Sequence, residues 1–254
     1  MSREDVKYEL QELLVRYQKE ADTGDAAGQF NLATMYERGN RLVKRDYQAA
    51  IQWYLKAAKQ GYARAQVNLG VMFMRGRGVE RNYDEALKWY RKAAVKGNAV
   101  GQVNLGIMYE KGLGIESDNK EAVKWYRRAA EQGEAKGQIN LGYLYEKGLG
   151  VRLDCQQAAK WFKNAAEQGE PRGQVNLGIL YMKGSGVRKS YEKAFNMFKK
   201  AADQGYGLGQ VNLAIVYEKG FGVEKNIDQA LELYRLAAAQ GLTFAQEALE
   251  RLEL

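Results

Sequence analysis

Asparagine and basic side chains recur along the chain in a fixed local context. Each asparagine stands directly before a Leu-Gly or Leu-Ala pair, and a basic residue follows about two helical turns later. A carboxamide offers a hydrogen-bond donor and an acceptor together, which suits the main chain of an extended peptide. The series therefore predicts a surface that holds a peptide by its backbone. Its members are Asn31, Asn68, Asn104, Asn140, Asn176 and Asn212, with Arg38, Arg75, Lys111, Lys147, Lys183 and Lys219.

Apolar residues flank these asparagines on a helix side opposite the core trio exemplified by Leu69, Met72 and Phe73. A solvated helix favours Lys, Glu, Gln or Ala over Val and Ile, so this second apolar side predicts a covering partner. A structural alternative stays open, in which these rows are half buried between neighbouring helices and each asparagine bonds the adjacent unit. The pairs are Val67 and Val71, Val103 and Ile107, Ile139 and Tyr143, Val175 and Ile179, and Val211 and Ile215.

Catalytic chemistry is poorly supported by the residue types. The chain has no His, and its single Cys, Cys155, occupies a position that holds Tyr in three other copies of a repeated unit. The Gly-x-Gly turns, such as Gly76 and Gly78, lack the preceding strand of a dinucleotide fingerprint and the Gly-Lys-Ser or Gly-Lys-Thr of a P-loop. We expect no catalytic residue, no metal site and no cofactor, and hence no enzyme.

A repeated unit positions all of these residues. The pentapeptide at residues 66–70 recurs at a 36-residue step, at residues 102–106, 138–142, 174–178 and 210–214. An earlier copy lies 37 residues before the second, because the loop after Gly39 carries one more residue. A unit this short cannot bury its apolar face alone. The repetition therefore predicts stacking of the units into a solenoid.

Each unit is predicted to contain two helices, which we name A and B in chain order. In one copy, helix A contains Ala65 and ends at Gly76, where glycine adopts a left-handed conformation without steric cost. Asn82 is the expected N-cap of helix B, with Glu85 completing a capping box. Gly97 ends helix B. The expected fold is an all-α solenoid of stacked antiparallel helix pairs.

The whole chain, residues 1–254, is predicted to be a single repeat domain. Residues 1–24 form an N-terminal half-repeat or capping helix, residues 25–241 form six repeats of about 36 residues, and residues 242–254 form a C-terminal capping helix. This organisation predicts seven A helices and seven B helices.

The unit formed by residues 65–73, 76–79 and 83–94 resembles the Sel1-like repeat, a relative of the tetratricopeptide repeat. The resemblance covers nearly the whole chain and implies a right-handed superhelical solenoid. Its concave face, lined by A helices, is expected to bind peptides or proteins. Members of the family serve as adaptors and as bacterial virulence or secretion-linked factors. One secreted branch pairs two cysteines per repeat and is associated with β-lactam binding. The present chain, with one cysteine, departs from that branch.

Charge and hydropathy argue against nucleic-acid-binding and membrane-inserted classes of protein. The net charge is +8, but basic residues alternate with acidic neighbours, so no specific nucleic-acid binding is expected. No apolar run approaches membrane-spanning length and no signal sequence is visible, which predicts a soluble, cytoplasmic protein without membrane insertion. Removal of a signal peptide or non-classical secretion remains an open alternative.

These observations favour a non-catalytic protein-interaction scaffold or adaptor of bacterial type, which binds a peptide or protein in the A-helix groove. The alternatives are an inhibitor or immunity-type regulator that wraps one cognate enzyme or toxin, or a secretion-linked bacterial virulence factor. An unrecognised enzyme and a consensus-engineered array are further alternatives that the residue pattern leaves open.

Overall fold

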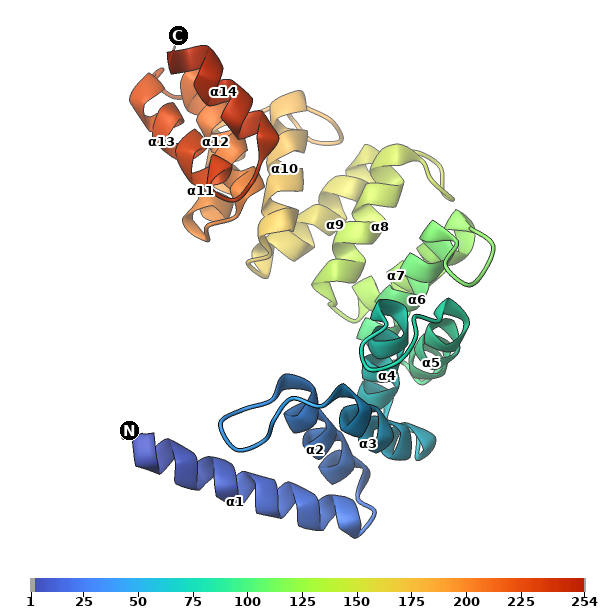
Figure 1. Cartoon of the computed structure of the whole chain (residues 1–254). Helices are drawn as coiled ribbons and strands as arrows, with labels where there is room; N and C mark the ends of the chain where they lie inside the picture. Colours follow the sequence, from blue (N-terminus) through green and yellow to red (C-terminus); the bar gives the residue numbers. More distant parts are fainter. Residues whose placement is uncertain (1–2, 254) are drawn as a thin grey trace. The chain divides into compact units, whose positions relative to one another are not determined.

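The computed structural model describes residues 3–253, and these residues form 14 helices and no strand (Figure 1). The first and last residues of the predicted domain, 1, 2 and 254, lie outside the described part. The B helices are α1 (Arg3–Asp22), α3 (Tyr47–Lys59), α5 (Tyr83–Val95), α7 (Asn119–Glu131), α9 (Cys155–Glu167), α11 (Tyr191–Asp203) and α13 (Ile227–Ala238). The A helices are α2 (Ala26–Arg38), α4 (Ala63–Arg75), α6 (Ala99–Lys111), α8 (Ala135–Lys147), α10 (Pro171–Lys183), α12 (Gly207–Lys219) and α14 (Thr243–Glu253).

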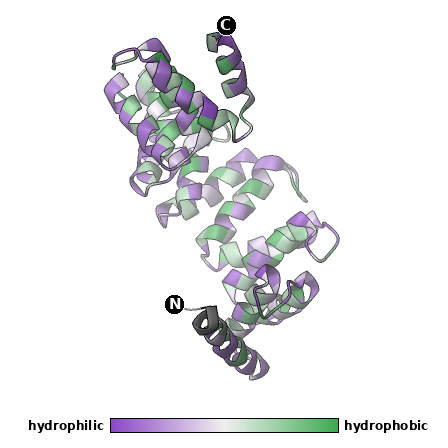
Figure 2. Ribbon diagram, turned by 60° about the vertical axis from the view of Figure 1, so that its left-hand side comes forward, coloured by the Kyte–Doolittle hydropathy of each residue, from purple (hydrophilic) through white to green (hydrophobic). Residues whose placement is uncertain are grey.

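The chain divides into two compact units, Met1–Ala129 and Ala130–Leu254, and the division falls inside α7. Within each unit, helices that follow one another in the chain pack together, as α2 does with α3 and α10 does with α11. Figure 2 shows hydrophilic and hydrophobic residues along the same helices, so each helix divides its surface between the core and solvent. The all-α repeat architecture with seven A and seven B helices is confirmed in the described residues.

Glycine ends the helices as predicted. Gly76 follows α4 with φ 65° and ψ 37°, the left-handed conformation, and its N–H donates to the carbonyl of Met72. Gly97 follows the C-cap of α5 with φ 85°. Because L-residues adopt these angles only with strain, glycine fixes both reversals of the repeated unit.

The N-caps of the B helices are confirmed, whereas the predicted capping box is wrong in its second half. The Asn82 side chain accepts from the Glu85 N–H at 3.0 Å. The Asn82 N–H, however, donates to the carbonyl of Phe73 at 2.9 Å, and the Glu85 carboxylate instead pairs with Lys88. The reason is geometric, since the short turn brings the last free carbonyls of helix A next to the start of helix B.

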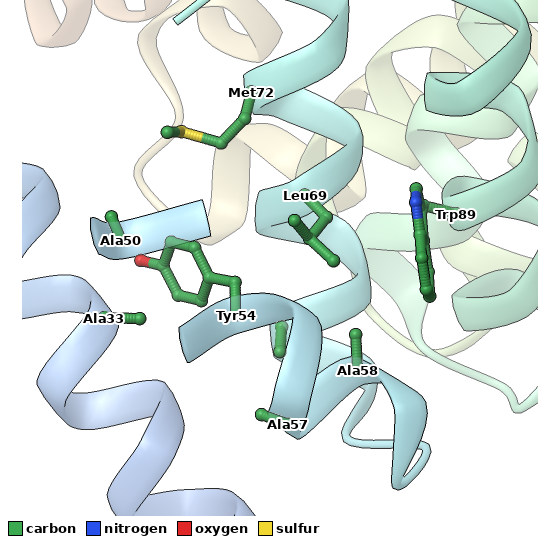
Figure 3. Packing of buried hydrophobic residues seen from close by; sticks show 9 residues of the cluster. Ala33, Ala50, Tyr54, Ala57, Ala58, Leu69, Met72 and Trp89 are labelled. Atoms are coloured by element: carbon green, nitrogen blue, oxygen red, sulfur yellow. The ribbon is translucent and has the colours of Figure 1, made fainter. Parts of the chain in front are cut away.

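Each repeat places one fully buried aromatic ring in the core, among alanine and larger apolar residues. Tyr54 of α3 is fully buried, with Ala33 of α2 on one side and Leu69 of α4 on the other (Figure 3). In the next repeat the ring of Tyr90 lies directly on the α4 backbone at Gly70, where an added Cβ would lie 2.3 Å from ring atom Cε1. Small residues on the A helices thus let the B-helix rings pack closely.

Candidate functional site

The second apolar side of the A helices is partly buried. The first member of each predicted pair is 2–7% exposed, so its side chain packs inside the structure and is not accessible to a partner. Val67, for example, packs in the cluster that contains Tyr90 of its own repeat and Leu105 of the following one. This burial agrees with the structural alternative for these positions. The buried members are Val67, Val103, Ile139, Val175 and Val211.

The second member of each pair keeps part of its surface accessible. Four are half-buried aliphatic residues, and Tyr143 is 37% exposed. They recur one helical turn after the buried members, so each A helix presents one apolar position at its surface. These residues, and not the buried ones, are available for contact with a ligand. They are Val71, Ile107, Tyr143, Ile179 and Ile215.

The asparagine series divides into engaged and free side chains, all half buried. Asn68 donates Nδ2 to the hydroxyl of Tyr54 at 2.8 Å, and Asn212 donates to the Leu208 carbonyl at 2.7 Å. Phe198, at the position equivalent to Tyr54, has no hydroxyl to offer Asn212. In the described part of the chain, the other asparagine side chains have no hydrogen-bond partner. These are Asn31, Asn104, Asn140 and Asn176.

The basic residues at the ends of the A helices are all exposed. Lys147 pairs with the adjacent Glu146 at 3.2 Å, and Lys219 pairs with Glu218 at 2.6 Å. Among the described residues, the remaining members of the series have no ion-pair partner. Their charges are therefore available to an acidic ligand. They are Arg38, Arg75, Lys111 and Lys183.

The A helices of the first unit enclose a pocket of about 530 Å³. Asn68 and the buried Val67 line it beside Phe30. The exposed guanidinium groups of Arg38 and Arg64 lie at the same pocket, so it combines an apolar surface with positive charge. An extended peptide needs both kinds of contact, because its backbone is polar and its side chains alternate. Three successive A helices contribute to this pocket.

A hydrogen-bond network fixes the polar wall of this pocket. The Tyr54 hydroxyl donates to Glu37 at 2.7 Å, lies 3.1 Å from the Thr34 hydroxyl, and accepts from Asn68. Burial raises the pKa of Tyr54 above its ordinary value, and the Glu37 carboxylate raises this pKa further. The phenol is therefore protonated at neutral pH and acts as the donor to Glu37. The network holds Asn68 in one orientation.

A buried glutamine series connects the repeats, and the sequence analysis did not assign it a role. Gln66, Gln102 and Gln138 each donate Nε2 to a main-chain carbonyl at the end of the preceding B helix, at 3.1–3.2 Å. A second glutamine at the end of the next B helix donates to the Oε1 of its A-helix partner. Four such pairs are Gln60 with Gln29, Gln168 with Gln138, Gln204 with Gln174 and Gln240 with Gln210. The 36-residue recurrence of both glutamines was the available signal.

Other site chemistry is sparse in the part of the chain that the structure describes. No group of three His, Cys, Asp or Glu residues there could hold a metal ion. Cys155 is half-buried and forms no disulfide. None of the described helices is both long and apolar enough to cross a membrane.

The stacked helix pairs and their accessible A-helix surface define a helical-repeat protein of the solenoid class. The sequence matches the Sel1 repeat at residues 26–62, 63–98, 99–134, 135–170, 171–206 and 207–242. The chain belongs to the Sel1 repeat family, and the predicted family is confirmed. Sel1 repeats commonly mediate protein–protein interaction and are generally non-catalytic.

Solved structures with the same fold include a protective antigen present in uropathogenic Escherichia coli strains. It is 39% identical with a TM-score of 0.83, covering 93% of this chain, which spans only 50% of that protein. A Sel1 repeat protein from Oxalobacter formigenes is 35% identical with a TM-score of 0.78, over 84% of this chain and 85% of its own. An immunity protein from Pseudomonas aeruginosa, 21% identical with a TM-score of 0.55 over 84% of this chain and 81% of its own, shares the fold alone. The comparison with curated proteins gave no match.

Proposed function

We propose that the chain is a non-catalytic interaction scaffold that binds a peptide or protein segment along the A helices. The observation that carries the proposal is the coincidence of free asparagine carboxamides with an accessible apolar position on the same helices. On α6, Asn104 has no partner and Ile107 is half-buried, and on α10 Asn176 stands likewise beside Ile179.

The asparagines and the apolar residues are proposed to contact different parts of the bound segment. A free carboxamide can accept from and donate to the main chain of a bound segment, which gives affinity without dependence on its sequence. The half-buried aliphatic residues then select apolar side chains, and Arg75, Lys111 and Lys183 add attraction for acidic ones. The engaged Asn68 and Asn212 keep a structural role in this arrangement.

The test is capture of partners by the wild type and by a variant with Asn104, Asn140 and Asn176 all changed to Ala. Partners recovered from the native lysate are identified by mass spectrometry, and the helical content and melting temperature of both proteins are compared. We expect the variant to fold normally and to lose the specific partners. Undiminished capture by a folded variant would show that the carboxamides do not bind the partner.

An immunity-type or inhibitory role has less support. The likeness to the Pseudomonas aeruginosa immunity protein is a likeness of fold, since the two chains are 21% identical. A scaffold predicts several captured clients, whereas an inhibitor predicts one enzyme or toxin. The same capture experiment therefore distinguishes the two functions.

A further inference from the structure

The glutamine series is interrupted at one repeat of the first unit. Where the other repeats place a glutamine at the end of helix B, the residue after α5 is Lys96. Its ammonium donates to the Gly61 carbonyl at 3.1 Å, just as Gln204 donates to the Gly169 carbonyl at 3.0 Å. Gln204 also donates to the Oε1 of Gln174, and this second bond has no counterpart at Lys96.

Because Lys96 does not donate this second bond, the Oε1 atom of Gln66 is left without a hydrogen-bond donor. Gln66 is 3% exposed, and its Oε1 is buried without a hydrogen-bond partner. The orientation of the Gln66 amide is fixed by its Nε2, which donates to the Ala58 carbonyl. The reversed amide would place its oxygen against that carbonyl oxygen. A buried carbonyl oxygen without a donor is unfavourable, so a ligand N–H would satisfy this atom once the side chains that cover it move aside.

Gln66 lines a groove of about 800 Å³ between the end of α3 and one face of α5. The groove is separate from the A-helix pocket and is strongly positive, with Asp84 as the only acid among its lining residues. Lys88 pairs with Glu85 outside the lining, and Lys92 lies over the Trp89 ring. The cations in the lining are Lys59, Lys88, Arg91, Lys92 and Lys96.

The groove also presents apolar surface. Val95 is 71% exposed, and Leu87, about two turns earlier on α5, is in the lining at 9% exposure. A ligand that satisfies every feature must carry a negative charge, an N–H donor near that charge, and an apolar side chain. The carboxyl-terminal residue of a peptide carries these three groups on adjoining atoms, whereas a simple carboxylate or sulfate has no donor at neutral pH.

We propose that this groove binds the carboxyl terminus of a peptide that ends in an aliphatic residue. The α-carboxylate accepts from the ammonium groups of Lys96 and Lys59, and the terminal amide N–H donates to Gln66 Oε1. The aliphatic side chain contacts the exposed Val95. This site requires none of the A-helix asparagines and stands independently of the scaffold proposal.

The test uses the tripeptide acid N-acetyl-Ala-Ala-Leu and two matched probes in isothermal titration calorimetry at low ionic strength. One probe is the carboxamide, which removes the charge, and the other carries an N-methyl group on leucine, which removes the terminal donor. We expect each change to weaken binding about tenfold or more, the effect of losing one charge-assisted or buried hydrogen bond. Equal affinity for the acid and either probe, or no binding of the acid, would overturn the proposal.

Substitutions at Lys96 separate the two recognition elements. Lys96→Gln supplies a donor to Gln66 Oε1, as in the other repeats, and should abolish binding of the acid. Lys96→Met removes the ammonium but leaves the acceptor open, so binding should weaken while the preference for the N–H probe over the N-methyl probe persists. Lys120→Gln, the same charge change at an exposed position outside the groove, should bind as the wild type does. Unchanged binding by Lys96→Gln would refute the site.

Discussion

The Arg251 guanidinium on α14 binds both carboxylate oxygens of Glu218 on α12, at 3.0 and 2.8 Å. Arg251 stands 36 residues after Ile215, so the terminal helix places a cation where α4, α6, α8, α10 and α12 place an apolar residue. Glu218 is 5% exposed and also accepts from the Tyr234 hydroxyl at 2.9 Å. The pair therefore attaches the C-terminal helix to the last full repeat through a largely desolvated carboxylate.

The Glu218 pair should make the second unit sensitive to acid. Burial alone would raise the pKa of Glu218, but hydrogen bonds from Arg251, Lys219 and Tyr234 outweigh it and lower this pKa to about 2. A carboxyl with a lowered folded-state pKa stabilises the protein above its unfolded pKa, about 4.3, and the gain disappears as the pH falls toward 2. The shift corresponds to a loss on the order of 3 kcal/mol. Urea unfolding of the wild type and Glu218→Gln at pH 7, 4 and 2.5 measures it.

Two controls accompany the acid titration. Glu218→Gln should be less stable than the wild type at pH 7, and this difference should shrink at pH 2.5. Arg251→Met keeps apolar contact but removes the main donor, which raises the folded-state pKa of Glu218 toward its unfolded value, so the acid-dependent loss should become smaller. Parallel pH dependences for the wild type and Glu218→Gln would contradict the assignment.

Lys96→Gln should stabilise the first unit. The new amide can donate to the unpaired Gln66 Oε1 and retain the bond to the Gly61 carbonyl, as Gln204 does with Gln174 and Gly169. Satisfying a buried acceptor is worth about 1 kcal/mol. Chemical denaturation measures the gain, with Lys96→Met as the control that supplies no donor. A Lys96→Gln protein no more stable than Lys96→Met would show that Gln66 gains nothing from the amide.

Most of the helical framework could be predicted from the sequence because its determinants are local. Gly76 and Asn82 specify a helix end and a helix start through their own backbone and side-chain preferences. The partner of the Asn82 N–H was not predictable in the same way, since it depends on how closely two helices approach across the turn. In the structure the Asn82 N–H donates to the Phe73 carbonyl and not to the Glu85 side chain.

The candidate site was harder to read from sequence for a related reason. Val67 and Val71 share an apolar type and differ by one helical turn, yet one is buried by the next repeat and the other is half-buried. Similarly, Tyr54 and Tyr90 each stand 14 residues before an asparagine of the series, yet of the two only Tyr54 bonds its asparagine, Asn68. Contacts between helices decide which apolar residue is buried and which asparagine is bonded. The periodicity within one helix does not reveal these contacts.

The corrected capping geometry predicts unequal effects at two neighbouring positions. Asn82→Ala should destabilise the first unit by about 1 kcal/mol, because it removes the acceptor for the Glu85 N–H. Glu85→Ala should cost less than about 0.5 kcal/mol, since its carboxylate makes an exposed ion pair with Lys88 and no capping bond. Equilibrium denaturation of both variants tests the difference. Equal losses would restore the reciprocal capping box as the better description.

A pair of tyrosines offers a test of the polar network at the A-helix pocket. The Tyr54 hydroxyl contacts Glu37, Thr34 and Asn68, whereas the Tyr90 hydroxyl has a 3.5 Å contact with the sulfur of Met74. Tyr54→Phe should therefore cost about 1–3 kcal/mol, because partly buried polar groups lose their partner. Tyr90→Phe should be nearly neutral, since a thioether is a weak acceptor.

The same tyrosine pair also separates stability from partner binding. Tyr54→Phe releases Asn68, which then joins Asn104 as a free carboxamide in the first unit, while the exposed Arg38 remains in place. If the free carboxamides hold the partner, Tyr54→Phe should lower the unfolding midpoint yet retain partner capture. Denaturation and capture are measured on the same preparations, with Tyr90→Phe as the matched control. A folded Tyr54→Phe protein that loses its partners would instead place the Tyr54 hydroxyl or an ordered Asn68 in the binding surface.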